Sequence, residues 1–287
     1  MVISTRRRMD VFRAYVLLPH AVPIIAVMSA TATFAVIARG GWPGWADMGA
    51  LLLAMFGGQV SVGVVNELVD VDLDRAAKQH KPIPSGLVTE RGARIMLLAG
   101  LAMMVIGSVR FSFTAFSLCA LGTGLGIAYS FWFKRTPWSW IPYVLAIPLL
   151  PTWVWSALDQ VPASLLALYP IAIPALVAVQ LAQSIPDIEG DARNGVRTLA
   201  VMLGIDGARV MCHGCILASV ALASVLAPFA SDNAMYGWVG SVVAVTLVAV
   251  NAGIWRRDEH QGRMSCFPLV AAAVGVMGAG WALAMVT

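Results

Sequence analysis

The sequence predicts an all-α integral membrane protein, a single membrane domain (residues 1–287) with nine transmembrane helices. Three observations point to this class. Hydrophobic residues make up 59% of the 287-residue chain and charged residues only 12%, which is far from the composition of a soluble domain. The apolar residues are grouped into runs of about 20, the length that crosses a bilayer as a helix. Basic residues are concentrated in alternate connections between these runs.

Nine apolar runs meet the length criterion for a membrane span. They lie at residues 20–38, 46–68, 93–109, 112–133, 138–158, 162–185, 202–228, 235–254 and 265–286. The first run follows several arginines, as a signal peptide would, but Pro19 and Pro23 open it and no clear cleavage site follows. We therefore expect it to be retained as the first membrane helix.

The distribution of charge predicts the orientation. Of the 19 lysines and arginines, only Arg39 and Arg110 fall in the connections that lie on the opposite side from the rest. The positive-inside rule makes the basic side cytoplasmic, with the N-terminus inside and the C-terminus outside. We expect the protein in a bacterial inner (plasma) membrane. The net charge of +4 therefore reflects topology, and no nucleic-acid partner is expected.

The first polar motif follows the second apolar run. Asn66, Asp70 and Asp74 recur every four residues, which places them on one face of a helix, one turn apart. Three oxygen-bearing side chains in a line suit Mg²⁺, which often also carries substrate phosphates. Ionisable side chains at the edge of the hydrocarbon are costly and so indicate function. A solvated helix end is the alternative for this segment taken alone.

A second motif follows the sixth run, where Asp187 and Asp191 are again four residues apart. Even-numbered spans end on the cytoplasmic side, so both motifs reach the same face of the membrane. Paired carboxylates on two helix ends are typical of a two-metal clamp on a diphosphate. Asp72 and Glu189 are expected to point away from the metal-facing side.

A site of four aspartates, two Mg²⁺ ions and a diphosphate needs additional positive charge. Lys81, Lys134 and Arg197 lie on the correct face to supply it, although basic residues there also set topology or contact lipid headgroups. Pro82 and Pro84 follow Lys81 and predict an extended segment that holds its ammonium in place.

Together with Tyr129, these motifs resemble the UbiA superfamily of intramembrane prenyltransferases over nearly the whole chain. The resemblance implies a helical bundle around a central cavity, capped on the cytoplasmic side by loops at approximately residues 70–94 and 187–204. It implies a Mg²⁺ site, with two ions, in which the four aspartates are catalytic. The implied metal residues are Asn66, Asp70, Asp74, Asp187 and Asp191, and the implied diphosphate contacts are Lys81, Tyr129, Lys134 and Arg197.

The resemblance also implies a reaction. An isoprenyl group would be transferred from its diphosphate to a lipophilic acceptor, in contact with membrane lipids, and the acceptor and the chain length are not evident from the sequence. A terpene cyclase of the same family, which ionises the diphosphate without an acceptor, is the alternative. A transporter with intramembrane acidic sites is a more remote alternative. The ionisable residues of a transporter should lie near mid-membrane, whereas the acidic motifs of this chain lie at one membrane face beside basic connections.

Overall fold

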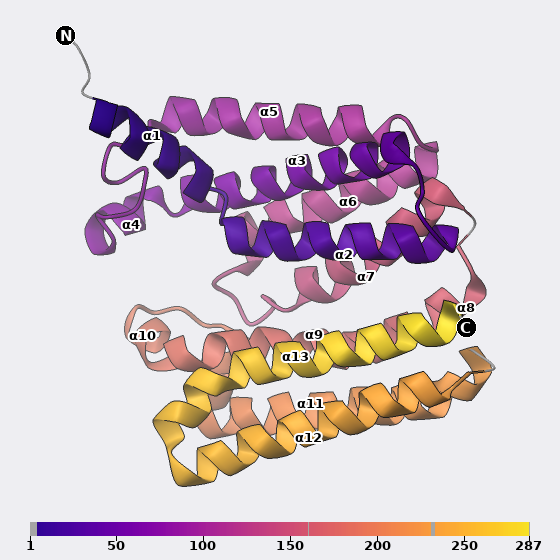
Figure 1. Cartoon of the computed structure of the whole chain (residues 1–287). Coiled ribbons are helices and arrows are strands. Elements are labelled where there is room, and N and C mark those ends of the chain that lie inside the picture. The colour runs from indigo at the N-terminus through magenta and orange to yellow at the C-terminus, as the bar shows by residue number, and fades with distance from the viewer. Residues whose placement is uncertain (1–4, 160, 231–232, 287) are drawn as a thin grey trace. The chain divides into compact units, whose positions relative to one another are not determined.

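The computed structural model describes residues 5–159, 161–230 and 233–286, and these residues form helices and connecting turns with no strand among them (Figure 1). Within the described chain, eight helices are long and apolar enough to cross a membrane, and a shorter apolar helix covers Pro23–Arg39. These correspond in order to the nine predicted spans, so the protein is an integral membrane protein of the predicted helical class.

The chain forms two compact units. Unit 1 comprises Met1–Phe131 and Leu149–Gln160, and unit 2 comprises Trp132–Pro148 and Val161–Thr287. The single-domain organisation and the central cavity stay predictions.

Unit 1 contains the first six helices in chain order. They are α1 (Thr5–Leu17), α2 (Ala21–Arg39), α3 (Trp45–Val69), α4 (Val71–Ala77), α5 (Glu90–Ser108) and α6 (Phe113–Ala128). Helix α7 (Ile141–Leu158) contributes its last residues to this unit. Helix α3 is central because it packs against α2, α5 and α6, and the motif at its C-terminal end is thereby anchored in the core.

Unit 2 is built from the remaining helices. They are α8 (Ala163–Leu166), α9 (Leu168–Ser184), a 3₁₀ turn (Ile185–Asp187), α10 (Ile188–Arg193), α11 (Leu199–Ala230), α12 (Met235–Arg257) and α13 (Glu259–Val286). Two predicted spans differ in detail. The span at 162–185 is divided into α8 and α9, and α11 carries a non-helical residue at Gly204, with φ 67° and ψ 178°.

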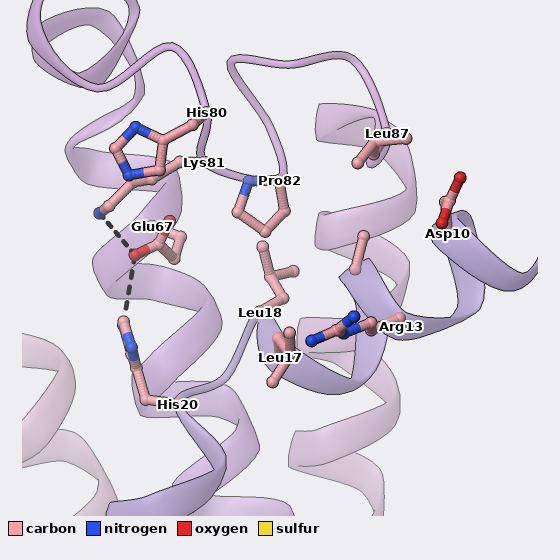
Figure 2. A pocket seen from close by; sticks show the side chains of 11 residues that line it. Asp10, Arg13, Leu17, Leu18, His20, Glu67, His80, Lys81, Pro82 and Leu87 are labelled. Carbon is pink, nitrogen blue, oxygen red and sulfur yellow. Dashed lines mark hydrogen bonds and ion pairs between the residues drawn. The ribbon is translucent and has the colours of Figure 1, made fainter. Parts of the chain in front are cut away.

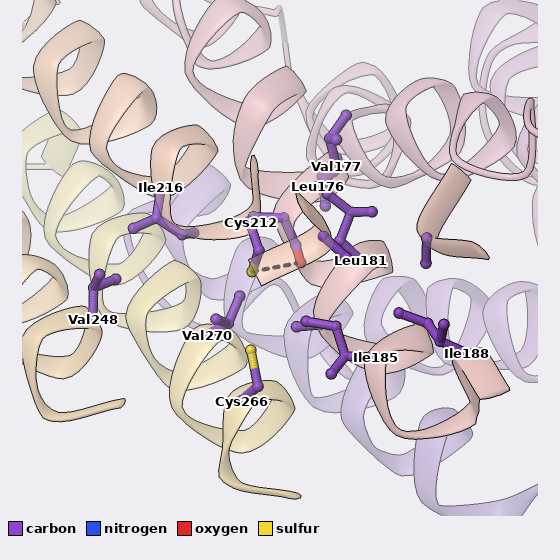
Figure 3. Packing of buried hydrophobic residues seen from close by; sticks show 14 of the residues in the cluster. Leu176, Val177, Leu181, Ile185, Ile188, Cys212, Ile216, Val248, Cys266 and Val270 are labelled. Atoms are coloured by element: carbon purple, nitrogen blue, oxygen red, sulfur yellow. Dashed lines mark hydrogen bonds between the residues drawn. The ribbon is translucent and has the colours of Figure 1, made fainter. Parts of the chain in front are cut away.

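The core of unit 2 lies where α9, α11, α12 and α13 meet (Figure 3). Leu181 and Ile185 pack there against Cys212 and Val270, and all four residues are fully or almost fully buried. The Cys212 thiol donates to the Ala178 carbonyl at 3.4 Å, and all four cysteines of the chain are free. Cys119, Cys212 and Cys266 are buried as small side chains, and Cys215 is half-buried.

Close packing of α3 against α5 depends on glycine. A Cβ atom at Gly57 would meet the backbone of Gly100 and Met104 well inside van der Waals contact. Small residues are the usual means by which membrane helices approach one another.

Gly57→Ala should therefore lower the melting temperature in detergent, because overpacking costs about 1–3 kcal/mol. Gly122→Ala in α6 is the matched control, since nothing lies within 4 Å of a Cβ at that position. Equal melting temperatures for the two variants would show that the α3–α5 contact tolerates a methyl group.

Candidate metal and diphosphate site

The first motif lies where α3 ends and α4 begins. Asp70 sits between the two helices, with φ −88° and ψ −3°, so the motif is not one uninterrupted helix. The helical hydrogen bonds nevertheless continue across the junction, from Asp70 N to Asn66 O at 3.2 Å and from Asp74 N to Asp70 O at 2.9 Å. The four-residue spacing therefore keeps one turn between successive motif residues, as predicted.

The second motif has the same local geometry. Asp187 is the last residue of the 3₁₀ turn after α9 and directly precedes the short helix α10, with φ −98° and ψ −4°. Both first aspartates thus occupy the bridge region of backbone space, which is sparsely populated and recurs at active sites. In each unit an aspartate in this conformation directly precedes a short helix, and that short helix carries the second aspartate.

The carboxylates of the first motif are buried. Asp70 is 8% exposed and Asp74 6% exposed. Lys81 Nζ donates to Asp74 Oδ2 at 2.7 Å and to Glu67 Oε1 at 2.8 Å. Burial opposes the charge on Lys81, but the hydrogen bonds to Asp74 and Glu67 outweigh it and raise the pKa of this ammonium. Lys81 therefore stays charged and bridges two carboxylates.

Glu67 is the residue that the sequence analysis missed. It is 3% exposed, and its Oε1 lies 3.2 Å from His20 Nε2 as well as within hydrogen-bond distance of Lys81 (Figure 2). His20 reaches it from the start of α2, in a left-handed conformation with φ 61°. The sequence did contain a signal for Glu67, namely a carboxylate in the last turn of an apolar helix. A buried acid needs a cationic partner, so its position predicts an ion pair.

The backbone around Lys81 corrects one expectation. The prediction of an extended segment is wrong, because the chain turns here: Ser85 N donates to Lys81 O at 2.9 Å and Val88 N to Pro82 O at 3.0 Å. The prolines at 82 and 84 occupy turn positions, where their fixed φ is tolerated and their missing N–H is not needed. Lys81 is held by its two ion pairs and by this turn.

Two acidic residues of the motifs point to solvent. The side chain of Asp72 is 89% exposed and pairs with Arg75 at 3.0 Å. Glu189 is 60% exposed and pairs with Arg263 at 3.0 Å. This agrees with the expectation that both residues lie off the metal-facing side.

The predicted cations of unit 2 are partly brought together. Arg197 N donates to Arg135 O at 3.3 Å, which places the Arg197 backbone beside the segment that begins with Lys134. Lys134 directly follows a π-helical turn over Tyr129–Phe133, a conformation often found at functional sites. Tyr129 and Lys134 are both half-buried.

A glycine ends α10 and directs the chain from Asp191 toward Arg197. Gly195 has φ +72°, and Val196 N donates to Asp191 O at 3.0 Å. Gly195→Ala should cost about 1–2 kcal/mol through backbone strain alone, since a Cβ there meets nothing within 4 Å.

The measurement is the melting temperature together with KM for the isoprenyl diphosphate that the sequence analysis expects as substrate. This KM should rise as the Asp191–Arg197 turn shifts. Gly190→Ala is the matched control, because it lies inside α10 with equal space and without a positive φ. A Gly195 variant that matches this control would show that the turn tolerates other conformations.

The residues present fit magnesium. Within the described residues, no three histidine, cysteine or acidic side chains are gathered closely enough to hold a metal ion by themselves. Mg²⁺, however, is usually bound by one or two carboxylates, completed by substrate phosphates and water. Each motif supplies two aspartates. In the first motif both are buried oxygen donors, and one of them, Asp74, already pairs with a cation, Lys81.

Two curated proteins are similar to this chain over two thirds of its length or more. Digeranylgeranylglyceryl phosphate synthase of Natronomonas pharaonis is 26% identical over 196 residues, which are 67% of this chain and 69% of that protein. 4-Hydroxybenzoate octaprenyltransferase of Paracidovorax citrulli is 30% identical over 240 residues, 80% of this chain and 78% of that protein.

A solved structure shares the fold. A UbiA homologue from Archaeoglobus fulgidus, bound to GPP and Mg²⁺, has a TM-score of 0.69 at 20% identity and covers 92% of this chain and 99% of that one. The model of the UbiA prenyltransferase family matches residues 26–274, a range that includes both aspartate motifs and the connections that follow them. Since this range is most of the chain, the protein belongs to the UbiA prenyltransferase family.

Proposed function

We propose that the protein transfers an isoprenyl group from its diphosphate to a lipophilic acceptor in a Mg²⁺-dependent reaction within the membrane. The observation that carries the proposal is the pair of aspartate motifs, each at the end of a membrane helix with its first aspartate in the same backbone conformation. The names of the relatives, which are prenyl-transferring enzymes, support it. Family membership also argues against the transporter alternative.

In this proposal, the metal-binding residues are Asn66, Asp70, Asp74, Asp187 and Asp191, with two ions in the site. Magnesium bound there would stabilise the negative charge of the departing diphosphate. The Archaeoglobus fulgidus homologue bound to GPP and Mg²⁺ supports this combination of ligands. The four aspartates are the catalytic residues in this proposal because they would hold the magnesium ions that balance the charge of the departing diphosphate.

Four cationic or polar side chains would contact the diphosphate: Lys81, Tyr129, Lys134 and Arg197. Lys81 is a flexible point charge that binds phosphate without bidentate geometry, and its pairing with Asp74 at 2.7 Å keeps it beside the first motif. When the allylic C–O bond breaks, its electron pair leaves with the diphosphate oxygen, and these residues orient that oxygen. The resulting carbocation is protected from water by the surrounding apolar helices.

The proposal is tested with purified protein in lipid nanodiscs, given farnesyl or geranylgeranyl diphosphate, Mg²⁺ and a lipid extract as the source of acceptor. We expect a prenylated lipid by mass spectrometry, together with inorganic diphosphate, and neither in EDTA. Product formation that survives EDTA would contradict the role of magnesium. A cyclised hydrocarbon or alcohol formed without the extract would instead assign the protein as a terpene cyclase.

The orientation is also a proposal: N-terminus and basic connections in the cytoplasm, C-terminus outside, in a plasma membrane. One structural observation supports it. Arg110 is one of the two basic residues on the less basic side, and its charge is balanced there by an ion pair with Asp47 at 2.9 Å. A membrane-impermeant thiol reagent added to intact cells should label a cysteine introduced at Asp159 and not one introduced at Lys78. The reverse labelling would overturn the orientation.

A further inference from the structure

One buried glutamine of unit 2 carries an unpaired amide oxygen. Gln180 lies on α9, about two helical turns before Asp187, and only 4% of it is exposed. Its side-chain oxygen is buried and has no hydrogen-bond partner within the described residues. A buried polar atom without a partner is costly, and in a native protein it requires an explanation.

The orientation of this amide follows from its neighbour Ser184. The Ser184 hydroxyl donates its hydrogen to the backbone carbonyl of Gln180 at 3.0 Å, so the hydroxyl oxygen is left to accept. The amide nitrogen of Gln180 donates to it at 3.3 Å. Exchanging the nitrogen and the oxygen of the amide would bring two oxygens together with no hydrogen between them. The unpaired atom is therefore the oxygen.

The amide nitrogen also reaches a distant part of unit 2. Gln180 Nε2 donates to Ser139 Oγ at 3.0 Å, and Ser139 is fully buried. Ser139 belongs to the connection between the π-helical turn and α7, which begins with Lys134 and is called the Lys134 connection below. Near its start, this connection accepts the hydrogen bond from Arg197 N to Arg135 O at 3.3 Å. Gln180 thus links α9 to a connection that carries one proposed diphosphate contact and adjoins another.

On α9, the amide lies on the face that leads to the second motif. Ser184 directly precedes the 3₁₀ turn that ends at Asp187, and residues three apart are aligned in such a turn. Asp187 therefore follows Ser184 on one face of the chain. Leu181 and Ile185 fix the helix independently, because both are packed in the core of unit 2 (Figure 3). The end of α9 is thus a firmly packed support for the Lys134 connection.

A role in stability alone does not account for the glutamine. A methionine of similar length would fill the same space without burying an unpaired oxygen, and replacing a hydrogen-bonded group by an apolar one of the same shape can be nearly neutral. What the amide provides, and methionine does not, is the link to Ser139.

We infer that Gln180 is a positioning residue of the prenyl-transfer reaction. Its amide holds the Lys134 connection against the end of α9, so that Lys134 meets the diphosphate bound at the second motif. Gln180 itself touches neither metal nor substrate and acts through Ser139. The inference rests on the proposed function, because it deepens the account of that site.

The test compares Gln180→Met with the wild-type protein in lipid nanodiscs, with the lipid extract as the source of acceptor. We expect KM for farnesyl diphosphate to rise at least about tenfold, equal to about 1.4 kcal/mol, with a much smaller change in kcat. The inhibition constant of inorganic diphosphate with Mg²⁺ should rise by the same factor. The melting temperature should shift by less than about 4 °C, because removal of the unpaired oxygen offsets the lost hydrogen bonds.

Two variants of unit 2 are matched controls. Gln261→Met makes the same change at an exposed glutamine of α13 and should alter neither KM nor the melting temperature. Gly240→Ala places a Cβ atom 2.9 Å from the Val276 carbonyl oxygen, so it should lower the melting temperature and leave KM unchanged. An equal rise of KM in the Gly240 and Gln180 variants would show that KM only follows stability, which would overturn the inference.

Ser139→Ala breaks the same link from its other end. It should also raise KM for farnesyl diphosphate. The double variant Gln180→Met/Ser139→Ala should be no worse than the more affected single variant, because one link is lost only once. An unchanged KM in Gln180→Met, or increases that multiply in the double variant, would contradict the positioning role.

Hydrogen exchange separates this inference from the proposed function. Without donor or Mg²⁺, the backbone amides of the Lys134 connection should exchange faster in Gln180→Met than in Gln261→Met, because their attachment to α9 is lost. Equal exchange would overturn the inference. If the wild type binds farnesyl diphosphate with Mg²⁺ and Gln180→Met binds it equally well, the positioning role is wrong and the proposed function stands. If the wild type itself binds none, the proposed function is wrong and the positioning role falls with it, even where exchange shows that the link exists.

Discussion

Asp70→Ala and Asp191→Ala should each reduce diphosphate release by at least about a thousandfold, equal to about 4 kcal/mol of transition-state stabilisation. Each change removes one of the two aspartates that its motif contributes to the proposed metal site, and a metal's share of charge stabilisation typically amounts to several kcal/mol. Asp70 is 8% exposed, so Asp70→Asn, which keeps the shape, serves as a second variant that should fold. The measurement is release of inorganic diphosphate with saturating Mg²⁺ and donor.

The first motif contains its own control. Asp72 lies two residues from Asp70, but its side chain is 89% exposed and paired with Arg75. Asp72→Asn should therefore retain wild-type turnover. Equal losses in the Asp70 and Asp72 variants would mean that the negative charge of the segment, and not a specific ligand, matters. Full activity in Asp70→Asn or Asp191→Ala would contradict the proposal that both motifs bind the metal ions.

The second large effect is expected at Lys81, where the structure suggests two consequences of one substitution. Lys81→Met removes the ammonium that pairs with Glu67 and Asp74, and those carboxyl groups are 3% and 6% exposed. Removing one partner of a buried ion pair typically costs about 3–5 kcal/mol, so the melting temperature should fall clearly. If Lys81 also binds the diphosphate, KM for the donor should rise at least about tenfold, or about 1.4 kcal/mol.

Glu67 allows the two consequences to be separated. In Lys81→Met/Glu67→Gln, one of the unpaired carboxylates is neutralised, so part of the lost stability should return. KM for the donor should remain high, because the phosphate-binding cation is still absent. Lys81→Arg should recover part of both properties, and Lys78→Ala, an exposed lysine of the same connection, should change neither. A double variant with normal KM would show that Lys81 acts only by holding the first motif.

The sequence by itself determined the class of the protein and the positions of its motifs. Both are local properties: an apolar run of about 20 residues can only cross a bilayer as a helix, and a four-residue spacing places Asn66, Asp70 and Asp74 one turn apart on any helix. For this reason the spacing survived even where the helix is interrupted at Asp70. The exposure of Asp72 and Glu189 followed from the same periodicity.

Only the tertiary structure decided what surrounds the motif. Glu67, His20 and Lys81 are far apart in the chain, and their contacts of 2.8 and 3.2 Å depend on how α2 and the turn after α4 pack against α3. The sequence predicted an extended segment at Lys81 because prolines exclude a helix, but they exclude neither a turn nor its hydrogen bonds. The link from Gln180 to Ser139 likewise arises from packing, since the two residues are 41 positions apart in the chain. Periodicity reports which face of a helix a residue occupies, whereas the partner on that face is set by long-range contacts.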